Sequence, residues 1–459
     1  MENIYFIGIG GIGMSAIARF FLKEGRRVAG YDRIESELTR HLVEEGAEVH
    51  YTDDPEAIPQ EFRNPQTTVV VYTPAIPDDH RELNYFRNGG FEVVKRSEVL
   101  GHLSEGKMVM AVAGSHGKTT TTTLIAWLNH FAAGGGQAFL GGISLNFGSN
   151  MVLETGHRFA VEADEFDRSF LRLHPDIAVV TSADADHLDI YGTHRELKRA
   201  FCQFISQIKP TGTLIIKRGV KLNLKHLAIH KYTYAYDDQR ADFYACNIHL
   251  GDDGRYTFDI VCPDRKIEGC RLGVMGRVNI ENAVAAVAAF WAAGCINDAK
   301  LKAALAEFRG VKRRFECYIN TPEKVYIDDY AHHPAELKAA IRSIRDAYPG
   351  RRLTVIFQPH LYTRTRDFYR GFAASLSLAD NVLLLPIYPA REEPIKGVTS
   401  RLIAHRVLRP CHVIEKSQIA EVLSSMPTDV VVSFGAGDID RECATIAQTL
   451  KESMTKANE

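Results

Sequence analysis

The sequence contains no run of about 18 apolar residues, which excludes a predicted transmembrane helix. No basic segment precedes the apolar start MENIYFIG, so no secretory signal is predicted. No C-x-x-C pair occurs among the eight cysteines, which argues against a zinc or thiol-redox site. A net charge of −2 provides no basic field for nucleic acid or anionic membranes. These absences predict a cytoplasmic protein with reduced thiols and with no nucleic-acid or membrane partner.

The chain of 459 residues is too long for one typical domain. Apolar strand patterns separated by helical patterns recur along it and predict parallel α/β sheets. Shorter, more polar strand patterns at 232–275 predict an antiparallel flank on the second sheet. We therefore expect three α/β domains, at 1–104, 105–314 and 315–459, with a mixed sheet in the second.

A glycine-rich turn lies near the N-terminus, in YFIGIGGIGMSAIARFFLKEG at 5–25. The order strand, Gly8-x-Gly10-x-x-Gly13, helix is typical of a diphosphate site, because backbone N–H groups and the helix N-terminus attract phosphate. Asp32 follows the next predicted strand and is expected to point at a ribose or a neighbouring group. The turn alone fits either a nicotinamide dinucleotide or a nucleotide-linked sugar.

A second glycine loop, AVAGSHGKTTTT, also lies between a strand pattern and a helix pattern. This context predicts a phosphate-binding P-loop, with Lys118 along the β- and γ-phosphates and the Thr119 hydroxyl on Mg²⁺. Val112 occupies the position of the usual first glycine. The residues expected to bind ATP here are Gly114, Ser115, His116, Gly117, Lys118, Thr119 and Thr120.

Two acidic clusters follow apolar strands of the same stretch. Carboxylates at the carboxyl ends of neighbouring strands could hold the metal that accompanies a nucleotide. We expect at least one metal ligand in each cluster. The clusters are Glu162, Asp164, Glu165 and Asp167, and Asp184, Asp186, His187 and Asp189.

Seven motifs occur in one order: GSHGKTTTT, EADEFDRSF, DADHLDIYG, NIENAVAA, GVKRRFE, DDYAHHP and FQPHLYTRT. With the glycine-rich start, the chain resembles the ATP-dependent Mur ligases of peptidoglycan synthesis over essentially its whole length. The resemblance implies a Rossmann-like N-terminal domain for a UDP-linked substrate, a central P-loop ATPase domain and a Rossmann-like C-terminal domain for an amino acid. It also implies ATP and Mg²⁺ as cofactors, and a monomer or homodimer that joins L-alanine to UDP-N-acetylmuramate.

The resemblance assigns roles to particular residues. It implies that the first turn binds the UDP diphosphate through Gly10, Gly11, Gly13 and Met14, with Asp32 nearby. Thr119 and Glu162 match the first Mg²⁺ site, and His187 matches the side of the second metal or phosphate. The nucleotide would also contact Asn279, Asn282 and either Arg313 or Arg314. The implied catalytic residues are Lys118, His187, His332 and Arg364, and the implied amino-acid contacts are Tyr330, His332, His360 and Arg364.

Two positions depart from the family pattern. Val278 stands where a histidine is usual, and Leu361 stands where many members carry an arginine. Arg391 could restore the missing positive charge. Three alternatives remain: a recycling ligase that attaches a whole tripeptide, a nucleotide-dependent switch without ligase chemistry, and an NAD oxidoreductase. The HxYTRT pattern at 360–365 favours a ligase that attaches L-alanine over one that attaches a whole tripeptide.

Overall fold

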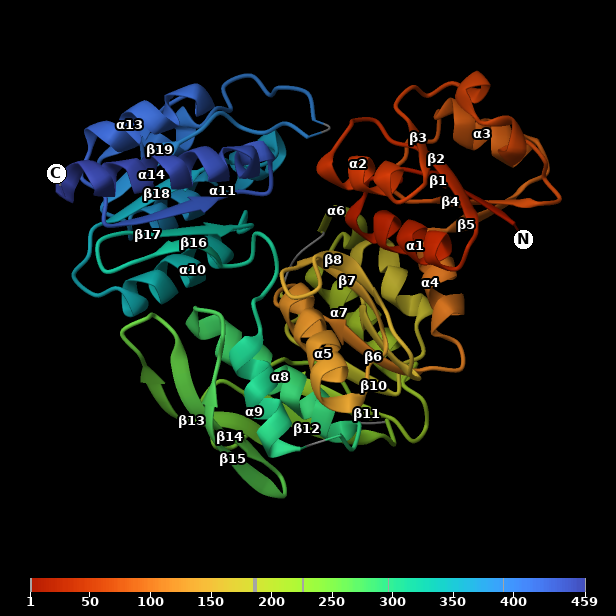
Figure 1. Ribbon diagram of the computed structural model, residues 1–459, viewed down its shortest axis with the longest axis horizontal. Coiled ribbons are helices and arrows are strands. Elements are labelled where there is room, and N and C mark those ends of the chain that lie inside the picture. The colour runs from red at the N-terminus through yellow and green to blue at the C-terminus, as the bar shows by residue number, and fades with distance from the viewer. Residues whose placement is uncertain (1, 185–187, 225–226, 296, 391, 459) are drawn as a thin grey trace. The chain divides into compact units, whose positions relative to one another are not determined.

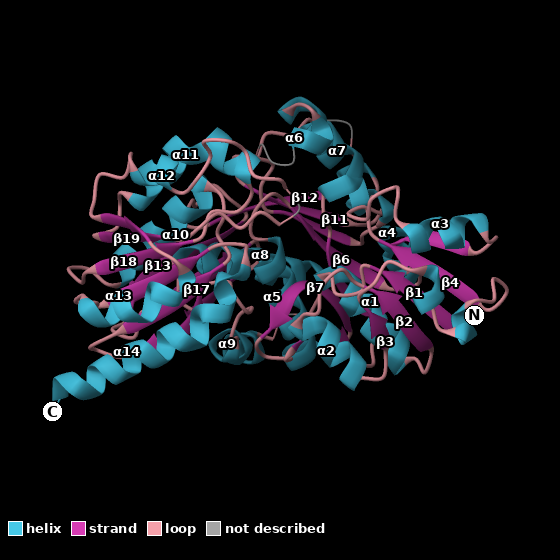
Figure 2. Ribbon diagram, turned by 90° about the horizontal axis from the view of Figure 1, so that it is seen from above, coloured by secondary structure: helices cyan, strands magenta, loops and turns pink. Residues whose placement is uncertain are grey.

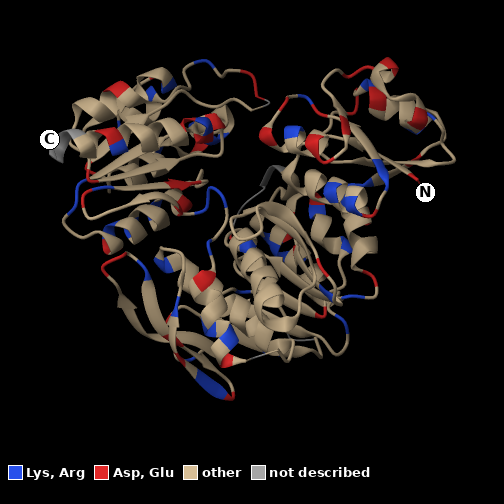
Figure 3. Ribbon diagram, in the orientation of Figure 1, with Lys and Arg blue, Asp and Glu red and all other residues tan. Residues whose placement is uncertain are grey.

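The computed structural model describes residues 2–184, 188–224, 227–295, 297–390 and 392–458 (Figure 1). Within these residues the strands form three sheets. The chain divides into two compact units, one of 1–247, 258–270 and 281–309, the other of 248–257, 271–280 and 310–459. Figure 3 shows Lys and Arg interspersed with Asp and Glu in both units, in keeping with the small net charge. Among the described residues, no helix combines the length and apolar character needed to cross a membrane.

The first sheet is parallel throughout, with the order β3-β2-β1-β4-β5. Its two faces are covered separately, because Phe6 packs with α1 and α2 whereas Tyr5 packs with α3. Its strands are β1 (Asn3–Ile7), β2 (Arg27–Tyr31), β3 (Glu48–His50), β4 (Thr68–Tyr72) and β5 (Glu92–Lys95). Its helices are α1 (Ile12–Lys23), α2 (Glu37–Glu44), α3 (Arg81–Asn88) and α4 (Arg96–Ser104), with 3₁₀ turns η1 (Pro55–Ala57) and η2 (Gln60–Phe62).

The second sheet has the order β15-β14-β13-β12-β11-β10-β6-β9-β7-β8. It is mixed, because β7 pairs with β8 in antiparallel fashion and with β9 in parallel. Its strands are β6 (Met108–Ala113), β7 (Gln137–Ser144), β8 (Ser149–Leu153), β9 (Arg158–Glu162), β10 (Ile177–Val180), β11 (Thr213–Lys217), β12 (His230–Ala235), β13 (Phe243–Leu250), β14 (Tyr256–Cys262) and β15 (Arg265–Arg271). The helical elements are α5 (Lys118–Ala133), η3 (Phe166–Arg172), α6 (Leu188–Tyr191), α7 (His194–Ser206), α8 (Arg277–Ala292) and α9 (Asp298–Glu307).

The antiparallel flank predicted from 232 onward is wrong at its first strand. β12 pairs in parallel with β11 and also with β13. The polar, alternating sequence of this stretch reports that the strand is only partly buried, as β12 is. Half-exposure does not fix the direction of a strand, since an outer strand of a parallel sheet is exposed as well.

The third sheet has the order β16-β17-β21-β18-β19-β20 and is parallel except for the β16–β17 pair. Helices flank its strands (Figure 2), with α10 and α11 packed on one face and α13 and α14 on the other. Its strands are β16 (Glu316–Asn320), β17 (Val325–Asp329), β18 (Leu353–Phe357), β19 (Asn381–Leu384), β20 (Cys411–Val413) and β21 (Val430–Phe434). Its helices are α10 (Pro334–Ala347), α11 (Tyr362–Leu376), α12 (Arg401–Ala404), α13 (Ile419–Ser425) and α14 (Cys443–Asn458), with η4 (Lys416–Gln418) and η5 (Asp438–Glu442).

A buried carboxyl group lies on the α3 side of the first sheet. The Tyr5 hydroxyl donates to Oε2 of Glu82 at 2.6 Å, and the backbone N–H of Asp54 donates to Oε1 at 3.2 Å. Nε2 of His50 lies 2.7 Å from the Tyr5 oxygen. The Glu82 side chain has no exposed surface, and this burial raises its pKa to about 7. Folding therefore favours the protonated form of Glu82.

We expect Glu82→Gln to remove a pH dependence of stability. Because the pKa of Glu82 is higher in the folded chain, its contribution is present at low pH and is lost as the pH rises from about 4.5 to about 7. The wild type should lose up to about 1.4 kcal/mol per pH unit relative to the variant across this window. Urea unfolding of both proteins at pH 5 and pH 8 measures the difference, and equal pH dependence would contradict the assignment.

Candidate active site

The N-terminal glycine turn joins β1 to α1, and Asp32 holds it. The backbone N–H of Gly10 donates to Oδ2 of Asp32 at 2.8 Å. A Cβ atom at Gly13 would lie 2.7 Å from a guanidinium nitrogen of Arg96, so the turn and this arginine are in close contact. Met14 is buried at the start of α1. In this structure the Asp32 carboxylate thus binds the turn itself, and a contact with a ribose stays a prediction.

The P-loop lies between β6 and α5 and needs its two glycines. Gly114 has φ +140°, and a Cβ atom there would lie 2.1 Å from Oγ1 of Thr181. Gly117 has φ +80°, and a Cβ atom there would lie 2.8 Å from Oδ1 of Asn282. Val112, by contrast, is fully buried inside β6. The turn therefore begins at Gly114, which explains why the usual first glycine is dispensable here.

The remaining loop residues are held against the segment after β10. The His116 N–H donates to Oγ of Ser182 at 2.9 Å, and the Ser115 hydroxyl donates to the Asp184 carbonyl at 3.0 Å. Thr120 is buried in the first turn of α5. These hydrogen bonds hold the loop with its backbone N–H groups at the N-terminus of α5, where phosphate binds favourably. His187, predicted as a catalytic residue and metal ligand, lies outside the described residues.

Lys118 lies under the loop with all three of its N–H donors in use. Its Nζ atom lies 2.7 Å from the Gly114 carbonyl and 2.8 and 3.0 Å from the Glu165 carboxylate oxygens. Burial opposes its charge, but the carboxylates of Glu165, Asp164 and Glu162 outweigh burial and hold the pKa of Lys118 above its usual range. Lys118 is therefore a hydrogen-bonded cation at the N-terminus of α5.

Glu162 ends β9 beside the P-loop. The Thr119 hydroxyl donates to its Oε2 at 2.8 Å. A Cβ atom at Gly141 of β7 would lie 1.9 Å from the same oxygen, so glycine there makes room for the carboxylate. One hydroxyl and one carboxylate fit Mg²⁺, which takes few protein ligands and completes its shell with water and phosphate. Among the described residues, no cluster of three or more acidic, His or Cys side chains is arranged to hold a metal by itself.

A single cavity of about 300 Å³ connects the glycine turn to this carboxylate. Gly11, Gly13, Met14 and Glu162 all line it. Arg96 and Asp164 also line it, with their charged groups 3.8 Å apart. Thr73, Pro74 and Ala75, from the loop after β4, complete the wall. The cavity of the glycine turn thus reaches the P-loop through Glu162, which accepts from the Thr119 hydroxyl.

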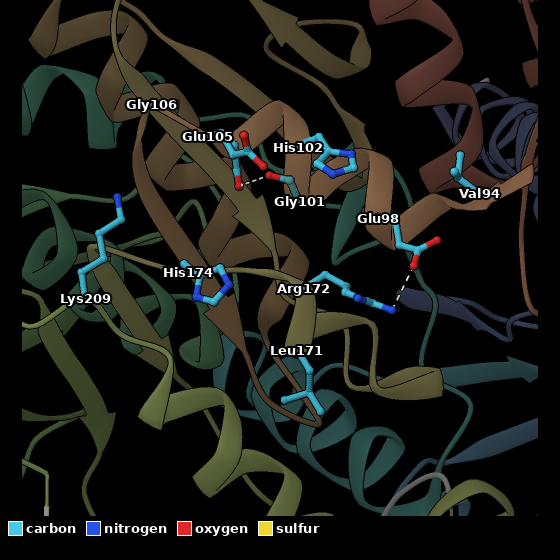
Figure 4. Close-up of a pocket in the computed structure, with 11 residues that line it drawn as sticks. Val94, Glu98, Gly101, His102, Glu105, Gly106, Leu171, Arg172, His174 and Lys209 are labelled. Carbon is cyan, nitrogen blue, oxygen red and sulfur yellow. Dashed lines mark hydrogen bonds and ion pairs between the residues drawn. The ribbon is translucent and has the colours of Figure 1, made fainter. Parts of the chain in front are cut away.

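A larger cavity of about 550 Å³ lies between α4 and the segment after η3 (Figure 4). Its lining includes Arg172 and Lys209, and both side chains form ion pairs. Arg172 pairs with Glu98 at 2.9 Å and Lys209 pairs with Asp176 at 2.7 Å. None of its lining residues belongs to either glycine loop. We therefore assign the chemistry to the smaller cavity.

The two asparagines of α8 have different local contacts. Oδ1 of Asn282 lies 3.4 Å from the Thr121 hydroxyl, directly behind the P-loop. The Asn279 amide donates to the Met275 carbonyl at 2.7 Å. Asn282 thus lies beside the P-loop, whereas the Asn279 side chain is hydrogen-bonded to the residue that shortly precedes α8.

The choice between Arg313 and Arg314 is narrowed by the hydrogen bonds of Arg313. Its guanidinium binds Asp328 at 3.3 Å and the carbonyls of Gly435 and Gly437. Both guanidinium groups, of Arg313 and of Arg314, lie 5.1 Å from the centre of the Tyr330 ring. Because Arg313 is used inside its own domain, Arg314 is the better candidate for a nucleotide contact.

The residues predicted to bind the amino acid gather at the carboxyl ends of β17 and β18. The rings of His332 and His360 are 6.1 Å apart, and Nη1 of Arg364 lies 3.5 Å from Nδ1 of His360. Nδ1 of His332 donates to the Tyr330 carbonyl at 3.0 Å, which leaves Nε2 as the proton acceptor. Burial lowers the pKa of His332 and keeps the ring neutral, whereas burial raises the pKa of Asp329 to about 6.

Comparison with known proteins agrees with this arrangement. The sequence matches the Mur ligase family catalytic domain at residues 3–108, the Mur ligase middle domain at 112–290 and the Mur ligase glutamate ligase domain at 313–437. The chain belongs to the Mur ligase family. The predicted α/β class with three sheet-bearing domains is thereby confirmed, and the domain boundaries expected from the sequence stay predictions.

This Mur ligase is similar to full-length relatives. It is 49% identical to the UDP-N-acetylmuramate–L-alanine ligase of Phocaeicola vulgatus over 98% of this chain and 99% of that protein. The enzyme of the same name from Porphyromonas gingivalis is also 49% identical, with the same coverage. The crystal structure of UDP-N-acetylmuramate–alanine ligase from Thermotoga maritima matches with a TM-score of 0.83 and 26% identity, covering 99% of this chain and all of that one.

Sequence reasoning missed two side chains that the Mur ligase fold brings to the site. Arg96 begins α4 directly after β5, where the carboxyl end of a parallel strand is a common ligand position. A basic residue directly after a predicted strand was the sequence feature that could have indicated a phosphate-binding role for Arg96. Glu165 was recognised only as one of four acidic residues, because nothing in the sequence shows that it reaches Lys118.

We expect Gly117→Ala to lose at least about 100-fold in Mg–ADP affinity, since the new methyl group meets Asn282 and the loop must move off the phosphates. Gly134→Ala is a matched control at the other end of α5, with φ +79° and open space around its Cβ position. It should cost about 1 kcal/mol of stability and leave ADP binding unchanged. Isothermal titration of both variants checks this, and similar ADP affinities would contradict the loop assignment.

Proposed function

We propose that this chain joins L-alanine to the lactyl carboxylate of UDP-N-acetylmuramate, with ATP converted to ADP and phosphate. The observation that carries the proposal is the single cavity that runs from the glycine turn to Glu162 beside the P-loop. A nucleotide sugar held by the turn could extend its acid toward the γ-phosphate along this space. Relatives that are 49% identical over nearly the whole chain bear the name of this activity. We further propose Mg²⁺ as the metal and the cytoplasm as the location.

The chemistry explains the need for two phosphate sites. A carboxylate becomes an acyl donor only when one oxygen is converted into a leaving group. Its oxygen attacks the γ-phosphorus, the bond to the β-phosphate breaks, and an acyl phosphate and ADP form. The first step brings an anion to a polyanion, so positioning and charge neutralisation dominate. Lys118 and the P-loop N–H groups would bind the phosphates. Thr119 and Glu162 would hold Mg²⁺, which would supply positive charge to the phosphates.

The C-terminal unit supplies the groups for the second step. The alanine amine must lose a proton before or while it attacks the acyl carbon, after which the tetrahedral intermediate expels phosphate. His332 is neutral and has Nε2 available, so it fits the task of accepting this proton. Arg364 offers a planar pair of N–H donors to the alanine carboxylate.

Phosphate release from ATP tests the function. It should require both UDP-N-acetylmuramate and L-alanine, and NAD should have no effect. Replacing alanine by the tripeptide L-Ala-γ-D-Glu-meso-diaminopimelate distinguishes the recycling ligase. Efficient release with the tripeptide and none with alanine would overturn the proposal, and release with neither amine would favour a nucleotide switch.

We expect Arg364→Ala to raise KM for L-alanine by about 100-fold with little change in KM for ATP, because a lost charge-assisted pair costs about 2–3 kcal/mol. Arg366→Ala, two residues further along α11, is the control, since its guanidinium pairs with Asp367 at an exposed position. Steady-state kinetics at saturating ATP measures both. An equal increase in the two KM values would remove Arg364 from the amino-acid site.

A further inference from the structure

The carboxylate of Glu165 binds the ammonium group of the P-loop lysine, Lys118. Both of its carboxylate oxygens lie within 3.0 Å of Nζ of Lys118, and the third donor of that nitrogen binds the Gly114 carbonyl. An ammonium group has three N–H donors and no more. A nucleotide phosphate that binds Lys118 must therefore displace at least one contact to Glu165.

The carboxylate of Glu165 has no route into solvent. Its side chain has no exposed surface, and that of Lys118 is 12% exposed. Its backbone carbonyl is anchored by the Tyr191 hydroxyl at 2.6 Å and by the Arg168 N–H at 3.0 Å. Because the backbone of Glu165 is anchored and its carboxylate is buried, we expect Lys118 to be the side chain that changes partners. A phosphate placed on Lys118 also lies close to the negative charge of Glu165, and the two anions repel each other.

We propose that Glu165 is a positioning residue that holds the Lys118 side chain against the P-loop and competes with the nucleotide phosphates for its ammonium group. This inference rests on the proposed function, in which Lys118 binds the β- and γ-phosphates. Two consequences follow. Lys118 is already ordered and charged when the nucleotide arrives, and the bound nucleotide is held less tightly than the loop alone would hold it, which favours release of ADP.

The test is the affinity of the whole protein for ADP in the presence of MgCl₂, measured by isothermal titration. Glu165→Gln keeps the shape and removes the charge. It should bind ADP about tenfold more tightly, the size of change expected when one charge-assisted contact no longer competes. Unchanged or weaker binding would overturn the inference. Asp176→Asn removes a carboxylate from another lysine pair, with Lys209 at 2.7 Å, and should leave ADP affinity unchanged.

A double-mutant cycle shows whether Glu165 acts through Lys118. In a Lys118→Met background, Glu165→Gln should no longer tighten ADP binding. A persisting tenfold gain would mean that Glu165 acts on the nucleotide directly, and the positioning role would be lost. If Glu165→Gln does not fold, Glu165→Asp, with a longer contact to Nζ, should give a smaller gain in the same direction, and no gain would again overturn the inference.

Steady-state kinetics separates positioning from a merely structural role. Glu165→Gln should lower KM for ATP without raising kcat, because tighter product binding slows the release of ADP. A purely structural residue would lower the melting temperature and raise KM instead. Failure of the wild type to bind ADP would refute the proposed function. Normal wild-type binding with no gain in Glu165→Gln would refute only this inference.

Discussion

The ion pair between Lys118 and the buried Glu165 is the contact on which the arrangement of the site depends. A buried cation is stable only when its charge is compensated and its donors are satisfied, and the Gly114 carbonyl and the Glu165 carboxylate do both. The pair joins the first turn of α5 to the segment after β9. Because β9 pairs with β6 in parallel, the P-loop and this segment leave the sheet at the same edge.

The segment after β9 holds cations of both predicted phosphate sites. Glu165 reaches Lys118 in the P-loop, whereas Asp164 lies near Arg96 and Asp167 binds Lys95 at 3.1 Å. Arg96 in turn touches the glycine turn at Gly13. One short acidic stretch therefore pairs with basic side chains in front of each turn. This explains why an acidic cluster can belong to a site whose ligands are themselves anions.

Much of the fold could be predicted from the sequence because strand, turn and helix follow one another within a few residues. Gly114, Gly117 and Lys118 are local in sequence, and their positions follow from the strand and helix on either side. The contact of Glu165 with Lys118 was harder to predict. The two residues are 47 positions apart, and only the order of strands in the sheet brings them together. The predicted direction of β12 was wrong for the same reason, since strand pairing is a property of the sheet and not of one strand.

Leu361 shows how a departure from the family pattern can leave a site intact. Its φ of +68° is costly for a side chain that is not glycine. The conformation is held by its N–H, which donates to the Tyr388 carbonyl at 3.0 Å, and by its carbonyl, which accepts from Thr365 at 2.8 and 3.1 Å. Arg391, expected to replace the missing charge, lies outside the described residues.

The turn at Leu361, rather than its side chain, sets His360 against Arg364. His360 precedes it, Arg364 stands in the first turn of the helix that begins after it, and the two come within 3.5 Å. A leucine in place of arginine at 361 therefore changes the charge available to the amino acid without changing this geometry. The carboxylate of a bound amino acid would then depend on Arg364, because the side chain at position 361 carries no charge.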